Sequence, residues 1–273
     1  MVEKGKSGSV INYDDARIIT LDILKSVAFY CDCNGIQYFL AYGTLLGAVR
    51  HKGYIPWDND IDIYVPRPDY EKLRSIVKRK PVHNTIDILD FNENKTFPFL
   101  KAVDNRTVLA EKYMVTEELL GVYVDIFPLD GLPDNKNDAF KLLKKSAFLN
   151  KLYSLSNYRF NTGSSRTIRI LKDLFYPISR LLPKKRICNK LDGLCEVYSY
   201  NSSKYVGNIV WGYGTREFLH KEWFVKTCEI EFEDGVFHAP INYDEYLKAI
   251  YGDYMTLPSV EDRVIHYFDT KWK

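Results

Sequence analysis

The sequence predicts a mixed α/β fold, in which a helical insertion interrupts a sheet-forming core. In the first 136 residues, segments with helical spacing of apolar residues alternate with short β-branched runs. The pattern becomes helical over residues 137–204, and strand signals return after residue 205 with a hairpin turn signal at Asp234-Gly235. We therefore expect a core at 1–136, a helical insertion at 137–204, and a C-terminal segment at 205–273 that completes the functional site.

The core is expected to begin with a long helix. Ile18, Leu21 and Leu24 fall on one side of this helix, and Asn34-Gly35 ends it in the manner of a C-terminal glycine. Pro68 favours the start of a later helix, because proline fits the first helical turn. The expected helices are Tyr13–Cys33, Thr44–Arg50 and Pro68–Arg79, and the expected strands are Ile36–Ala41, Ile61–Val65, Ile86–Leu89, Phe97–Val103 and Val122–Phe127.

The insertion is expected to consist of three helices, separated by the loop 161–165 and by Pro183. Pro177 should end or kink the middle helix, because proline removes a backbone donor. The C-terminal segment should contain a strand, a hairpin and a last helix. The expected helices are Asp138–Tyr158, Arg166–Leu182, Lys184–Tyr200 and Tyr243–Tyr251, and the expected strands are Tyr205–Val210, Glu229–Phe232 and Val236–Ala239.

Composition excludes several classes of protein. The formal net charge of the 273 residues is +2, which carries no signal for nucleic-acid binding. The five cysteines are odd in number and form no C-x-x-C pair, so we expect reduced thiols in a cytoplasmic protein. The first residues contain no apolar stretch typical of a signal peptide, and no apolar run approaches the roughly 20 residues that span a bilayer.

The basic, apolar stretches of the insertion permit two interpretations. They could lie on the anionic inner face of a membrane, close to a lipid-linked acceptor. Alternatively, they are ordinary amphipathic helices with a lysine-rich solvent face.

Gly43-Thr44 follows an apolar run and precedes a short helix. A glycine at this junction lets the backbone approach a phosphate, and the free N–H groups of the helix start favour an anion. Thr44 could add a hydroxyl donor. The alternative is a glycine turn with a threonine N-cap.

Asp60 and Asp62 belong to a β-branched run, and alternate residues of a strand point to the same face. Two such carboxylates repel each other unless a cation lies between them, and Mg²⁺ prefers carboxylates together with substrate phosphate oxygens. A solvated edge strand or an N-cap cluster is the alternative. Asp125, a lone acid in an apolar strand, is the best candidate for a third ligand, whereas Asp130 lies beyond Pro128 and is expected in a loop or turn.

Three sequence blocks resemble one family. They are L-A-Y-G-T-L-L-G-A-V-R-H-K-G-Y-I-P-W-D-N-D-I-D-I-Y-V, G-V-Y-V-D-I-F-P-L-D-G and Y-D-E-Y-L-K-A-I-Y-G-D-Y-M-T-L-P. They closely resemble the signature blocks of the LicD phosphocholine transferase family, a branch of the nucleotidyltransferase superfamily that is related to the fukutin group. The resemblance implies a nucleotidyltransferase-type core and an enzyme that moves phosphocholine from CDP-choline onto sugar hydroxyls of surface glycans.

The resemblance also implies roles for individual residues. Gly43 and Thr44 would lie at the donor phosphates, and Asp60, Asp62 and Asp125 would be the metal ligands and catalytic acids. The family's usual run is W-D-D-D, and here its middle acid is replaced by an asparagine at position 59. The expected metal is Mg²⁺ or Mn²⁺.

Cations close to a pyrophosphate would neutralise charge on the leaving nucleotide. Arg50 and Lys52 after the short helix, and Lys101 in a strand-like run, are the candidates. A solvated basic turn is the alternative for Arg50 and Lys52.

Aromatic faces bind a quaternary ammonium through cation–π attraction. Core packing or stacking on cytosine would equally explain each aromatic residue. The candidates are Tyr42, Tyr54, Trp57, Trp211, Tyr213, Tyr251 and Tyr254.

We therefore expect metal-dependent transfer of phosphocholine from CDP-choline to a sugar hydroxyl of a glycan of the teichoic acid, lipopolysaccharide or capsule type, with release of CMP. Asp125 would complete the metal site and accept the acceptor's proton. The alternatives are transfer of ribitol phosphate or glycerol phosphate from a CDP-linked donor, transfer of the nucleotide itself, and a catalytically silent scaffold of the same fold.

Overall fold

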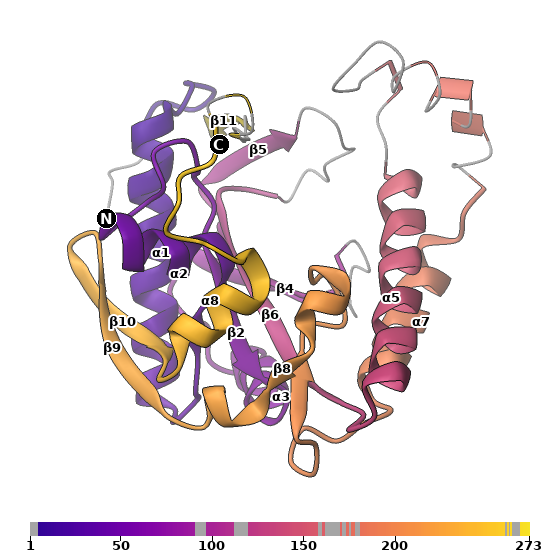
Figure 1. Ribbon diagram of the computed structural model, residues 1–273. Coiled ribbons are helices and arrows are strands. Elements are labelled where there is room, and N and C mark those ends of the chain that lie inside the picture. Colours follow the sequence, from indigo (N-terminus) through magenta and orange to yellow (C-terminus); the bar gives the residue numbers. More distant parts are fainter. Residues whose placement is uncertain are drawn as a thin grey trace.

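The computed structural model confirms a mixed α/β fold (Figure 1). It describes residues 5–90, 97–111, 120–157, 160–161, 170, 173–174, 176–177, 181–259, 261, 263 and 268–273. A seven-stranded sheet is accompanied by two separate two-stranded sheets in this part of the chain. No described helix is long and apolar enough to cross a membrane.

The main sheet has the strand order β1-β2-β6-β4-β3, and β7 joins β6 to β8. Within it, β2 and β6 are paired in parallel, whereas the other pairs are antiparallel. The strands are β1 (Phe39–Leu40), β2 (Asp62–Pro66), β3 (Ile86–Leu89), β4 (Leu100–Asp104), β6 (Tyr123–Leu132), β7 (Tyr205–Gly207) and β8 (Leu219–His220). All of the strands expected in the core are thus present, with β1 much shorter than predicted.

The helices predicted in the core are confirmed. They are α1 (Tyr13–Cys33), α2 (Tyr42–His51) and α3 (Arg67–Val77). Helix α1 begins where the Asn12 side chain accepts a hydrogen bond from the Asp15 N–H at 2.8 Å, and its apolar stripe packs on β4 and β6. Helix α3 packs on β2 and β6.

Helices α5 (Lys136–Ser156) and α7 (Lys184–Cys195) pack against each other and lie at the right of the molecule in Figure 1. Helix α7 ends five residues before the predicted end at Tyr200. Ten of the 17 residues of the predicted helix Arg166–Leu182 lie outside the described residues, and the described residues 170, 173–174 and 176–177 are helical. The expected end or kink at Pro177 stays a prediction, because residues 178–180 lie outside the described part of the chain.

The C-terminal segment contains the expected hairpin, β9 (Thr227–Phe232) and β10 (Gly235–Pro240), and the expected helix α8 (Tyr243–Tyr251). The predicted turn was displaced by one residue, since Gly235 pairs with Phe232 and the two turn residues are Glu233 and Asp234. Glu233 adopts a positive φ of 54°, which is normally a glycine conformation. Contacts to the loop after α2 hold it there: the Glu233 N–H donates to the Lys52 carbonyl at 2.9 Å, and its carboxylate accepts from the Tyr54 N–H at 2.8 Å.

Two further differences concern strands. The sequence did not predict β5 (Thr107–Glu111) and β11 (Phe268–Trp272), which pair with each other although about 160 residues separate them. The placement of Asp130 in a loop was wrong, because β6 continues through Pro128 to Leu132. Asp130 is fully buried and is held by Arg67, whose Nε donates to its carboxylate at 2.5 Å.

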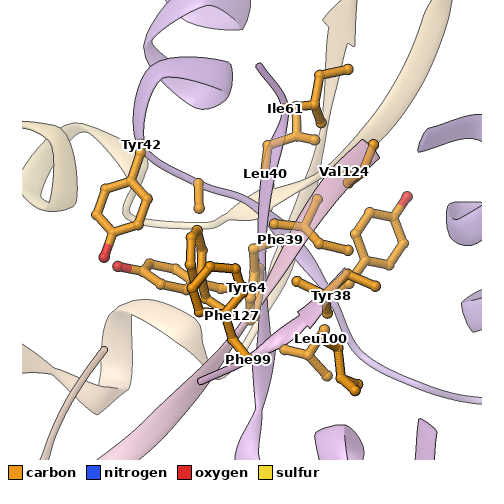
Figure 2. Close-up of a cluster of buried hydrophobic side chains, with 14 of the residues drawn as sticks. Tyr38, Phe39, Leu40, Tyr42, Ile61, Tyr64, Phe99, Leu100, Val124 and Phe127 are labelled. Carbon is orange, nitrogen blue, oxygen red and sulfur yellow. The ribbon is translucent and has the colours of Figure 1, made fainter. Parts of the chain in front are cut away.

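The hydrophobic core lies between the sheet and the helices. Figure 2 shows Tyr38, Phe39, Leu40, Ile61 and Val124 within it. Aromatic rings form its centre: the centroid of the Tyr42 ring lies 5.1 Å from that of Tyr64 and 5.8 Å from that of Phe127. Because Tyr42 is the first residue of α2, this packing fixes where α2 begins relative to β2 and β6.

Candidate active site

The acidic residues singled out from the sequence meet at one end of the parallel strand pair. Asp62, the first residue of β2, pairs in register with Asp125 of β6. On the other side of β6, Asp125 pairs with Lys101 of β4. Asp60 precedes β2 by two residues and interacts electrostatically with both Asp62 and Asp125. The fold therefore brings all three acids together from segments about 60 residues apart.

The start of α2 lies directly beside these acids. The Thr44 hydroxyl accepts a hydrogen bond from the Asp62 N–H at 2.8 Å, and the Ala41 N–H donates to the Asp62 carbonyl at 3.0 Å. Thr44 is 3% exposed, so in this structure its side chain ties α2 to β2. A Cβ at Gly43 would come within 2.8 Å of the Asp58 carboxylate, and glycine thus permits a close approach at the helix start.

The backbone at the start of α2 is strained. Tyr42 has a φ of +45°, a left-handed conformation that costs a non-glycine residue about 1–3 kcal/mol. Its N–H donates to the Tyr246 hydroxyl at 3.1 Å, and its own hydroxyl donates to Glu217 at 2.7 Å. These contacts to the C-terminal segment hold the helix start in position.

The charge balance around Asp62 favours a bound cation. Burial raises the pKa of the Asp62 carboxyl well above its ordinary value, and the negative charges of Asp60, Asp125 and Asp58 raise it further. The Lys101 ammonium opposes this effect. A cation between Asp60 and Asp62 would relieve the repulsion that these pKa shifts report.

Asp125 already has a cationic partner. The Lys101 ammonium forms an ion pair with its carboxylate, and the Lys101 side chain is 3% exposed. Burial raises the pKa of Asp125, whereas the charge of Lys101 and its hydrogen bond lower it. The same ammonium lies 3.6 Å from the centroid of the Tyr123 ring, 4.7 Å from that of Phe97 and 4.9 Å from that of Phe99. Lys101 thus occupies an aromatic cage closed by an acid.

The residues present fit a magnesium ion only in part. Within the described part of the chain, no three His, Cys, Asp or Glu side chains are grouped so that they could hold a metal ion by themselves. Mg²⁺, however, is commonly bound by one or two carboxylates that leave its other positions to water and substrate phosphates. The hard oxygens of Asp60 and Asp62 fit that chemistry, while Asp125 is engaged by Lys101. Its role as a third ligand stays a prediction.

The predicted cations Arg50 and Lys52 lie at the far end of α2. The Arg50 guanidinium donates to the Tyr254 carbonyl at 2.7 Å, and burial lowers its pKa. Lys52 is exposed, and it caps α2 in a left-handed conformation with a φ of +61°. A contact of Arg50 or Lys52 with the leaving nucleotide stays a prediction.

Sequence reasoning missed one buried acid that organises this region. Glu217 is fully buried, and its carboxylate accepts four hydrogen bonds. The hydroxyls of Tyr42 and Tyr64 donate at 2.7 and 3.0 Å, and the N–H groups of Tyr213 and Asn208 donate at 2.9 and 3.2 Å. Burial raises the pKa of Glu217, and the hydrogen bonds oppose that shift. Glu217 therefore joins the start of α2 to the loop 208–213.

The aromatic candidates separate into groups. Tyr213 links the rings of Tyr42 and Tyr251, with centroid distances of 5.2 and 5.9 Å. Trp211 lies 5.8 Å from Phe99, one wall of the cage around Lys101. Three candidates lie elsewhere: Tyr54 packs on Phe232, Trp57 lies against Arg263, and the Tyr254 hydroxyl donates to Asp244.

Comparison with known proteins confirms the resemblance found in the sequence. Residues 35–161 match the family model LicD, described as the LicD/FKTN/FKRP nucleotidyltransferase domain. Most of the chain is similar to the lipopolysaccharide cholinephosphotransferase LicD of Haemophilus influenzae, with 29% identity over 257 residues that cover 93% of this chain and 95% of the relative.

Two shorter matches are to uncharacterized proteins of Rickettsia. Those of Rickettsia prowazekii and Rickettsia typhi are 50% and 56% identical to this chain over 44 residues, which is 16% of its length and 16% and 14% of theirs.

Proposed function

We propose that this chain, which belongs to the LicD family through its nucleotidyltransferase domain at residues 35–161, transfers phosphocholine from CDP-choline to a sugar hydroxyl of a cell-surface glycan. CMP is the other product. The glycan is of the lipopolysaccharide, teichoic acid or capsule type. The name of the relative from Haemophilus influenzae, which aligns over nearly the entire chain, supports the choline and the glycan.

One structural observation carries the proposal. The parallel pairing of β2 and β6 places Asp62 beside Asp125, with Asp60 close by and the start of α2 adjacent. Such a site combines carboxylates with backbone N–H groups at a helix start, and both are features that position phosphate groups. Phosphoryl transfer depends mainly on positioning and charge neutralisation, so it requires no covalent nucleophile.

In this mechanism Asp60 and Asp62 hold Mg²⁺ or Mn²⁺, which when bound neutralises charge on the donor phosphates. Gly43 and Thr44 would lie at those phosphates, since the helix start beside Asp62 carries no side chain at Gly43. Asp125 accepts the proton of the attacking sugar hydroxyl while the oxygen of that hydroxyl forms a bond to the phosphorus that bears choline. The bond from that phosphorus to the CMP oxygen breaks, and CMP leaves with the electron pair.

Lys101 supports this role of Asp125. Its ammonium favours the ionised carboxylate, which is the form that accepts a proton. Arg50 and Lys52 would balance the negative charge of the departing nucleotide.

The test is CMP release from purified protein incubated with CDP-choline, Mg²⁺ and candidate glycans, with parallel reactions that contain CDP-ribitol or CDP-glycerol. We expect CMP in the CDP-choline reactions only. Release restricted to CDP-ribitol or CDP-glycerol would overturn the choline assignment. A chain that binds these donors and releases no CMP from any of them would be a silent scaffold.

A further inference from the structure

A pocket of about 430 Å³ lies between α5 and the loop 208–213. Its volume falls within the range of about 300–1,000 Å³ that is typical of small-molecule sites. The residues that α5 contributes to it are spaced by three or four positions, so they share one helix face. They are Ala147, Asn150, Lys151, Ser154 and Leu155. Trp211 and Gly212 form the opposite wall.

Trp211 is a rigid wall. Its ring is held between Phe99 and Tyr153, with centroids 5.8 Å away in each case and the Tyr153 ring nearly perpendicular. The backbone N–H of Trp211 donates to the side-chain oxygen of Asn208 at 2.9 Å. Gly212 has no room for a side chain, since a Cβ would lie 2.4 Å from the Asn208 carbonyl. The indole face is therefore positioned before any ligand arrives, which lowers the entropic cost of binding.

One of the lining residues, Asn150, carries an unsatisfied polar atom. The side-chain oxygen of Asn150 is buried and has no hydrogen-bond partner within the described residues. A buried polar atom in that state costs about 1–3 kcal/mol until a partner is supplied. A hydroxyl group suits it in either orientation of the amide, because a hydroxyl both donates and accepts. Ser154 stands one helical turn further on the same face.

The charge of the pocket argues against a cationic ligand. Among its described lining residues Lys151 is the charged one, and it is positive. A quaternary ammonium would be repelled there, although an aromatic face is present. A ring with several hydroxyls and an apolar face matches an indole, an amide and a serine hydroxyl.

We propose that this pocket binds a pyranose of the acceptor glycan, stacked on Trp211 and hydrogen-bonded to Asn150. This inference rests on the proposed function. The pocket adjoins the reacting groups through Phe99, whose ring centroid lies 5.8 Å from that of Trp211 and 4.9 Å from the Lys101 ammonium. Since Lys101 is paired with Asp125, a glycan anchored in this pocket leads toward the proposed base.

A direct test observes the indole N–H signals of the four tryptophans by NMR during titration with sugars. The probes are the methyl glycosides of glucose, galactose, N-acetylglucosamine and N-acetylgalactosamine. Trp211→Phe assigns the relevant signal. We expect at least one glycoside to shift the Trp211 signal and to leave those of Trp223 and Trp272 unchanged. A shift caused by choline chloride and by none of the glycosides would overturn the inference.

Variants test the same point in the transfer reaction. Ser154→Phe fills the pocket from an exposed position, and Lys145→Phe is the matched control at another exposed position of α5. Asn150→Leu removes the unpaired oxygen. We expect Ser154→Phe and Asn150→Leu to raise the KM for the acceptor about tenfold or more, with the KM for CDP-choline unchanged. Lys145→Phe should alter neither.

A purely structural role of Asn150 predicts something else, namely lower stability with an unchanged KM for the acceptor. That result would refute the inference. Its failure is distinguishable from failure of the proposed function. If glycosides shift the Trp211 signal but no donor releases CMP, the function is wrong and the pocket stands. If CDP-choline releases CMP but no glycoside shifts the signal, the pocket assignment is wrong and the function stands.

Discussion

Replacing Lys101 by methionine should destabilise the protein strongly, because it leaves the Asp125 carboxylate without its partner. The two side chains are 3% and 14% exposed, so their ion pair is shielded from water. Removing one member of a buried pair costs about 3–5 kcal/mol. The cation–π contacts with Tyr123, Phe97 and Phe99 are also lost, but the methionine sulfur would contact the same rings and offset much of that loss. We therefore expect the free energy of unfolding to fall by about 3 kcal/mol.

Urea denaturation followed by circular dichroism, with EDTA present to exclude divalent ions, measures this change. Adding Asp125→Asn to Lys101→Met removes the uncompensated charge and should restore at least half of the loss. Lys248→Met is the matched control, because Lys248 pairs with Asp244 at a surface where the two side chains are 63% and 45% exposed. It should leave the free energy of unfolding nearly unchanged, because ion pairs exposed to solvent contribute little. A loss below about 1 kcal/mol for Lys101→Met, or a double variant no more stable than Lys101→Met, would refute this reasoning.

Four further substitutions have defined outcomes. Glu217→Gln should lower the free energy of unfolding by about 2–4 kcal/mol in urea denaturation, because an amide NH₂ would face donors that now share a carboxylate; an unchanged midpoint would contradict the network. Gly47→Ala should lower the free energy of unfolding by about 1–3 kcal/mol, because its Cβ would lie 2.4 Å from the backbone carbonyl of Gly53. Gly193→Ala in α7 is the control. Its Cβ would meet nothing within 4 Å, and it should raise the free energy of unfolding by about 0.5–1 kcal/mol. Equal effects of the two alanines would show the packing argument to be wrong. Asp62→Asn should reduce CMP release at least about 100-fold while thermal stability stays equal or rises, because it removes a carboxylate that burial and its neighbours disfavour; retained turnover would exclude the metal assignment.

The sequence predicted the local elements of this fold well, and long-range pairing poorly. The spacing of apolar residues and the Asn34-Gly35 signal predicted both ends of α1 correctly, at Tyr13 and Cys33. The pairing of β5 with β11 leaves no such signal, because each strand is short and its partner lies about 160 residues away in the sequence. The turn of the β9–β10 hairpin was misplaced for a similar reason. Its register depends on contacts of Glu233 with Lys52 and Tyr54, which are distant in sequence.

The candidate site shows the same division. A pair of acids two residues apart in a β-branched run is visible in the sequence, and Asp125 could be selected as a lone acid in an apolar strand. Their juxtaposition follows from the parallel pairing of β2 with β6, which no local pattern encodes. Glu217 had no signal at all, since it ends a 3₁₀ helix of four residues (Gly214–Glu217) and its tyrosine partners are 153 and 175 residues away.

The most direct test of the central claim follows the choline group itself. Purified protein is incubated with Mg²⁺, a glycan acceptor and CDP-choline labelled in its methyl groups, and both the label on the glycan and the CMP are quantified. The account predicts one labelled choline on the glycan for each CMP released, and neither product with Asp62→Asn. CMP that appears without label on the glycan, or label that is transferred equally well by Asp62→Asn, would contradict it.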